Sequence, residues 1–160
     1  MCRARRLGWL AAAALSVLGP QIAYAQAATL TLVNAPVSLP SPTVADYNAG
    51  FVAAATGITF TVDITSGPNT KRTTIVSIRS TAATMGGTKP IGDLQWRRAD
   101  LGTWNSVTTS DVVVQTVTPF RKGDPPWSNT LFFRSLLSWT ADSPGSYSAP
   151  LVLTLTVTTP

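Results

Sequence analysis

The side chains that this sequence offers for catalysis are few in kind. All seven acidic residues are aspartates, there is no histidine, and the single cysteine is Cys2. The commonest general base, the commonest transition-metal ligands and the thiol nucleophile are therefore missing from almost the whole chain. What remains for chemistry is Asp, Ser, Thr, Tyr and three lysines.

The aspartates do not mark out an active site by their spacing. A pair of carboxylates could cleave glycosides, but nothing in the sequence singles out one pair. Asp93, Asp100 and Asp124 could offer oxygen ligands to calcium, yet they lack a D-x-D-x-D spacing, and a turn-forming role explains them better. A nucleophilic serine in G-x-S-x-G is also absent. We therefore predict a protein that is not an enzyme and that carries no metal or cofactor.

Tryptophans are the best candidates for contacting a ligand, because indole rings stack on sugar rings. Trp96 and Trp139 share the strand parity of Leu94 and Leu137, which favours packing in a core. Trp127 follows an Asp-Pro-Pro sequence in a predicted loop and has no apolar partner nearby in sequence. It is our candidate ligand contact; the alternative is a tryptophan that caps the end of the fold. Trp104 completes the set of four that could form an aromatic platform.

The N-terminus has the features of a secretory signal peptide. Arg3, Arg5 and Arg6 precede an apolar run over residues 7–18, and Ala23-Tyr24-Ala25 predicts cleavage before Gln26. The apolar run is too short to span a bilayer, and no second one follows. We expect residues 1–25 to direct export by the Sec route to the periplasm, cell surface or medium. Residues 26–160 would form a single domain without a transmembrane segment.

The charge left after that cleavage is modest. Residues 26–160 carry nine basic and seven acidic side chains, a net charge of +2. The candidate basic patch is scattered, with aspartates close by in sequence, so solvated strand faces explain it as well. We expect no nucleic-acid partner. The patch consists of Arg97, Arg98, Arg121, Lys122 and Arg134.

Apolar and polar residues alternate with a period of two along much of residues 26–160. Residues 58–65 are the clearest case, with Ile58, Phe60 and Val62 on one face. Turns rich in Gly, Pro, Asn and Asp separate such segments, and no helical stripe is present outside the signal peptide. The pattern predicts an all-β, immunoglobulin-like Greek-key β-sandwich of about seven to eight strands. Further strands are predicted over residues 29–33, 73–80, 92–98, 111–117, 131–140 and 147–158, and residues 46–57 fit either a helical turn or a poor strand.

The C-terminal segment suggests that this sandwich lacks a strand. Asp142, Gly145 and Tyr147 have the spacing of a tyrosine corner, which marks strand F of immunoglobulin-like domains. Strand G should follow, but the sequence ends first. The free edge would then be filled by the chain's own strand over residues 29–33, which carries Leu30 and Leu32, or by a strand of another chain, such as residues 29–33 of a neighbouring copy. The alternative is that residues 147–158 form the last strand of a complete sandwich. The residues of the predicted strand-pairing edge are Tyr147, Leu151, Leu153, Leu155 and Val157.

The segment PGSYSAPLVLTLTV, residues 144–157, resembles the end of bacterial fimbrial-type subunits and spore-coat-U-like secreted domains. The resemblance implies an incomplete immunoglobulin-like sandwich, periplasmic chaperone handling and assembly by donor-strand complementation. It rests on Gly145, Tyr147 and the run from Leu151 to Val157. The chain departs from the family in having no cysteine after residue 25 and in ending with Thr158-Thr159-Pro160, where the family often has an aromatic residue at the end of the last strand.

Together these observations predict an exported, non-catalytic structural or surface-assembly subunit. Its edge would pair with a strand of a neighbouring copy or of another surface subunit, with Leu30 and Leu32 as the donor side chains. The alternative is a secreted module that binds carbohydrate or protein through Trp127.

Overall fold

The computed structural model describes residues 27–159, and the predicted signal peptide with its cleavage site lies outside this range. The described residues form an all-β fold of two antiparallel sheets. Its elements are β1 (Ala28–Val33), α1 (Val44–Ala49), β2 (Phe51–Ala53), β3 (Ile58–Ile64), β4 (Arg72–Ser80), the 3-10 helix η1 (Ile91–Asp93), β5 (Leu94–Arg98), β6 (Asn105–Ser106), β7 (Val112–Phe120), β8 (Trp127–Leu136) and β9 (Leu151–Thr158). Among residues 27–159, no helix is long and apolar enough to cross a membrane.

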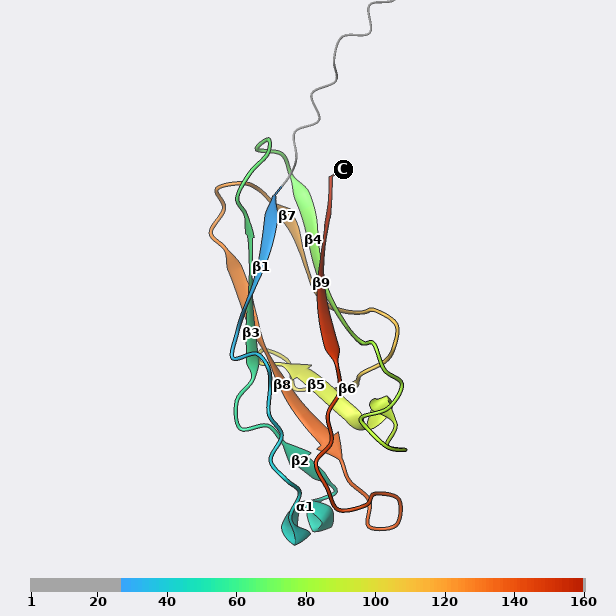
Figure 1. Cartoon of the computed structure of the whole chain (residues 1–160). Coiled ribbons are helices and arrows are strands. Elements are labelled where there is room, and N and C mark those ends of the chain that lie inside the picture. Colours follow the sequence, from blue (N-terminus) through green and yellow to red (C-terminus); the bar gives the residue numbers. More distant parts are fainter. Residues whose placement is uncertain (1–26, 160) are drawn as a thin grey trace, which may run out of the picture.

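The two sheets differ in size. The larger has the order β1-β3-β8-β5-β6, with β2 also pairing to β8, and the smaller has the order β7-β4-β9. The fold is elongated, and α1 and β2 lie at the end opposite the C-terminus (Figure 1). β1 closes one edge of the larger sheet and β9 one edge of the smaller, and the two strands run next to each other (Figure 1).

The core lies between the sheets, where the alternation seen in sequence turns apolar side chains inward. β3 is buried at every second residue, and Phe60 and Val62 are fully enclosed. β4 contributes Val76 and Ile78 from the other sheet, and β8 contributes Leu131 and Phe133. These strands confirm the predicted two-sheet, all-β architecture.

The strand β8 is shifted from its predicted position. β8 begins at Trp127 and ends at Leu136, whereas the sequence pattern predicted 131–140. Trp139 therefore lies beyond the strand, and its predicted place in the core is wrong: it is 56% exposed. Its ring stacks on Tyr47 with centroids 4.7 Å apart, and its Nε1 donates to Asn48. Trp96 is buried as predicted.

Residues 46–57 contain both of the structures that the sequence left open. Thr43 caps α1 by accepting from the Asp46 amide, and the Asp46 carboxylate accepts from the Thr43 amide in return. Gly50 ends the helix with a φ of 78°, a conformation that glycine adopts without strain. The short strand β2 follows directly and pairs with β8.

Candidate functional site

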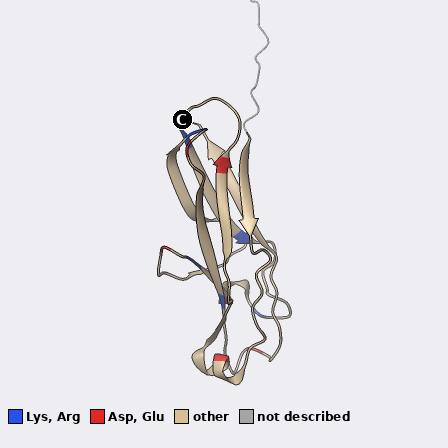
Figure 2. Ribbon diagram, turned by 90° about the vertical axis from the view of Figure 1, so that its left-hand side faces the viewer, with Lys and Arg blue, Asp and Glu red and all other residues tan. Residues whose placement is uncertain are grey.

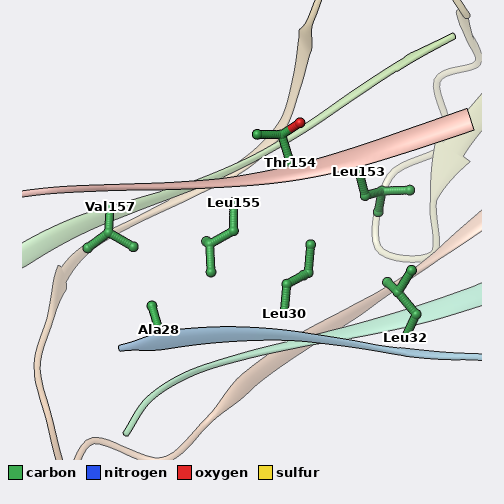
Figure 3. Close-up of a pocket in the computed structure, with 7 residues that line it drawn as sticks. All are labelled: Ala28, Leu30, Leu32, Leu153, Thr154, Leu155 and Val157. Atoms are coloured by element: carbon green, nitrogen blue, oxygen red, sulfur yellow. The ribbon is translucent and has the colours of Figure 1, made fainter. Parts of the chain in front are cut away.

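An apolar groove separates β1 from β9. Its volume is about 680 Å³, and side chains from the two strands point toward one another across it (Figure 3). The strands are neighbours but do not pair: β1 bonds to β3, and β9 bonds to β4. The groove is lined by Ala28, Leu30, Leu32, Leu153, Thr154, Leu155 and Val157.

The groove leaves large apolar side chains in contact with water. Leu32 is 40% exposed, and Leu153, Leu155 and Val157 are only half-buried. A second hollow of about 770 Å³ shares Leu32 and Leu153 with the first and continues toward Met85. The apolar lining thus extends beyond the strands themselves, along one side of the sandwich.

The free edge of β9 is unusually regular. The strand pairs with β4 in eight successive residue pairs, from Thr73–Thr158 to Ser80–Leu151, without a register shift. Its sequence, LVLTLTVT, contains no charge and no proline, and within residues 27–159 no strand pairs with its other side. Edge strands of this kind are templates for another strand, because a row of backbone donors and acceptors stays free.

The predicted donor segment is already engaged in its own chain. All six residues of β1 pair with β3, from Ala28–Ile64 to Val33–Thr59. Leu30 and Leu32 still face the groove from that position (Figure 3). To act as a donor for a neighbouring copy, β1 would have to leave β3.

Tyr147 precedes β9 and does not belong to it, because the strand begins at Leu151. Its hydroxyl donates to the carbonyl of Ser143, four residues upstream. Burial raises the pKa of Tyr147, and the negative charge of Asp142 raises it further. The back-bonded tyrosine predicted from the spacing is therefore present, although it serves the turn before the strand and not the edge.

Trp127 is not in a loop as the sequence suggested. It is the first residue of β8, and its ring meets Phe60 edge to face with centroids 5.7 Å apart. The indole packs against the core, and its Nε1 is buried without a hydrogen-bond partner. Its role as a ligand contact stays a prediction, and packing accounts for the position that it holds.

Two arginines lie among aromatic rings on a surface that the sequence does not predict, which we call the arginine–aromatic surface. The Arg97 guanidinium lies 5.2 Å from the ring centre of Trp104 and 5.1 Å from that of Phe132. Arg134 lies 4.4 Å from the ring of Trp104 and 5.1 Å from that of Phe51, and its Nε donates to Gln95. The sequence singles out Arg97 and Arg134 as parts of a basic patch and Trp104 as part of an aromatic platform, but it does not predict that they meet, because Arg134, Phe132 and Phe51 are distant from the other members in sequence.

The charged residues are spread over the fold. They appear singly or in small groups along the ribbon in Figure 2, without a broad basic patch in that view. Arg98, one member of the predicted patch, pairs with Asp100. Within the described part of the chain, no three residues of the His, Cys, Asp and Glu types gather closely enough to hold a metal ion.

Comparison with known proteins adds no relative. No protein-family model, curated protein or solved structure matches the chain.

Proposed function

We propose that this protein is an exported structural or surface-assembly subunit whose immunoglobulin-like sandwich is completed by a β-strand from a neighbouring chain. The observation that carries the proposal is the unpaired, uncharged and unbulged edge of β9 beside an apolar groove. A strand that pairs with this edge would satisfy its backbone groups and cover its half-buried leucines in one step.

The strand order supports an immunoglobulin-like assignment. Constant-type immunoglobulin domains have the order ABED in one sheet and CFG in the other. The order β1-β3-β8-β5 corresponds to ABED, and β4-β9 corresponds to CF, with β7 as an addition beside β4. The back-bonded Tyr147 before β9 supports its assignment as strand F. Strand G would lie on the free edge of β9, next to β1.

The donor that we propose is β1 of a neighbouring copy. Its apolar residues Ala28, Leu30 and Leu32 alternate with threonines, as a strand beside β9 requires. Four of its six residues are exposed. Among the longer strands of the larger sheet, β1 is therefore the one that packing holds least firmly. Such a strand is a reasonable source for exchange between copies.

The mass of the purified chain in solution tests the proposal. Size-exclusion chromatography with light scattering should give masses that are multiples of the single-chain mass. The average mass should increase with protein concentration. A single-chain mass at every concentration would contradict assembly between copies.

A second candidate function, ligand binding, is favoured by the arginine–aromatic surface. Trp104 and Phe51 offer ring faces, and Arg97 and Arg134 offer positive charge between them. Rings stack on sugars and guanidinium groups bind carboxylates, so the fitting ligand is an acidic polysaccharide. Tryptophan fluorescence during titration with polygalacturonate should change in the wild type and not in Trp104→Ala. The matched control is Trp139→Ala, which removes an exposed tryptophan elsewhere; equal responses from both variants would contradict this site.

A further inference from the structure

A buried group of charged side chains at one end of the sandwich is not used by the assembly proposal. Lys89 lies in the segment between β4 and η1, and Asp142 lies in the segment between β8 and β9. The Lys89 Nζ is 2.7 Å from Asp142 Oδ1 and 2.9 Å from Asp93 Oδ2. The side chains of Lys89 and Asp142 are only 2% and 6% exposed, and the ring of Tyr147 covers the ammonium at 5.3 Å.

We propose that Lys89 and Asp142 join in an intramolecular amide bond. The two groups that would react already touch, and their enclosure removes the water that opposes condensation. Holding reactants in contact raises their effective concentration to about 10⁵–10⁸ M. Removing a charged pair from water costs free energy, so a neutral amide is more stable than the ion pair in such a buried site.

The neighbouring groups fit the roles that this condensation needs. Asp93 accepts a hydrogen bond from the same Nζ and can relay a proton from nitrogen to oxygen. The backbone amide of Ser138 donates to Asp142 Oδ2 at 2.8 Å, where it would stabilise negative charge that develops on that oxygen. That hydrogen bond also holds the carboxylate so that Oδ1 faces Lys89.

The reaction balances without any other reagent. Burial lowers the pKa of Lys89, but its hydrogen bonds to Asp142 and Asp93 raise it above the usual value, so the amine starts as an ammonium. One proton passes by way of Asp93 to Oδ1 of Asp142, which gives a neutral amine and a carboxylic acid. The Nζ lone pair then forms a bond to Cγ, a second proton moves from nitrogen to Oδ1, and the Cγ–Oδ1 bond breaks. The products are the amide and one water molecule.

The bond would fix two irregular segments that are 53 residues apart in sequence. One of them leads directly into β9, because Asp142 precedes the strand by a short loop. A covalent link here would do the work of a disulfide in a chain whose residues 26–160 contain no cysteine. This inference does not depend on the assembly proposal.

Mass spectrometry of the folded, purified chain tests the inference. Loss of one water should lower the intact mass by about 18 Da, and a tryptic digest should contain a branched peptide that joins Lys89 to Asp142. Lys89→Arg keeps the positive charge but cannot supply a neutral amine, so it should show the full linear mass. Lys122→Arg, at an exposed lysine, should keep the link.

Asp93→Asn tests the relay, and we expect the linked fraction in this variant to fall at least about tenfold at equal times after refolding. Because cyclisation of an N-terminal glutamine would itself remove about 17 Da, the branched peptide decides the assignment. Separate, unmodified Lys89 and Asp142 peptides from the folded wild type would overturn the inference.

Discussion

The two edge strands of the smaller sheet, β7 and β9, differ in how well they prevent pairing with a strand of another chain. β7 pairs with β4 through two register shifts, and Pro119 lies at one of them. β9 pairs with the same strand through eight successive pairs without interruption. Bulges and prolines are common means of preventing edge-to-edge association. One edge of this sheet is therefore protected, and the other is left ready to pair.

Side chains from the larger sheet reinforce the protected edge. Arg98 of β5 donates to the carbonyl of Val114 on β7, and Asn129 of β8 donates to the side chain of Gln115. Across the groove, β1 and β9 face each other with apolar side chains, and the two strands are not paired by hydrogen bonds. Only one edge of the smaller sheet, that of β9, is therefore free to pair. This is the arrangement expected of a specific pairing site.

The largest expected effect comes from placing a charge in the groove. In Leu155→Lys, an incoming strand would bury an ammonium without a partner, so association should weaken by at least about 100-fold. The matched control is Val113→Lys on β7, where the side chain is 55% exposed and a lysine remains in water. Light scattering over a concentration series measures both variants.

The proposed difference between the two edges would be contradicted if Val113→Lys dissociated the assemblies as effectively as Leu155→Lys. Circular dichroism spectra that match the wild type are the control for folding in both variants. If neither variant changed the mass distribution, association would not involve this sheet.

The next effect concerns the donor strand. Thr31 of β1 and Thr61 of β3 lie directly opposite each other, so cysteines at these positions can join the two strands. In the oxidised Thr31→Cys, Thr61→Cys variant, β1 cannot leave β3, and we expect assembly to be lost and to return after reduction. This lock is a cleaner test than deleting residues 26–35, because deletion would also uncover β3. Assembly that persists in the oxidised form would show that another strand is the donor.

The smallest expected effect depends on pH and concerns Asp100, which pairs with Arg98, the side chain that donates to Val114 on β7. Hydrogen bonds from Arg98 and then Asn129 lower the pKa of Asp100 to about 2, from a usual value of 3.8. A lowered pKa means that the ionised carboxylate stabilises the fold above pH 3.8, and this contribution is lost as the pH falls toward 2. Melting temperatures of wild type and Asp100→Asn should therefore differ slightly near pH 6 and converge near pH 2. A difference that grows on acidification would contradict this role for Asp100.

Sequence patterns were sufficient for the elements whose alternation is local. The strands near 58–65, 73–80 and 92–98 are present because each has one apolar face to bury. One error arose where a pattern was extended past the end of a strand. Trp139 keeps the parity of Leu137, but parity has no structural meaning after β8 ends at Leu136. The two prolines before Trp127 predict a loop, but prolines can also stand directly before a strand, as they do at the start of β8.

The features of the sites were less predictable because they join residues that are distant in sequence. The apolar face of β9 and the alternation of β1 could be read directly, but the pairing of β1 with β3 could not, since it depends on sheet order. The Lys89–Asp142 contact and the arginine–aromatic surface had no local signal at all. The helix α1 did have one, because Thr43 and Asp46 have the spacing of a capping box and Gly50 follows as a stop.

Hydrogen exchange with a donor peptide tests the central claim most directly. A peptide with the sequence of residues 27–35, AATLTLVNA, should bind the chain and slow the exchange of amides in β9, while amides in β7 keep their rates. A control peptide of the same composition without the alternation should leave both strands unchanged. Protection of β9 alone is the result that the account predicts. Protection of β7 instead, or peptide binding that leaves β9 exchange unchanged, would contradict it.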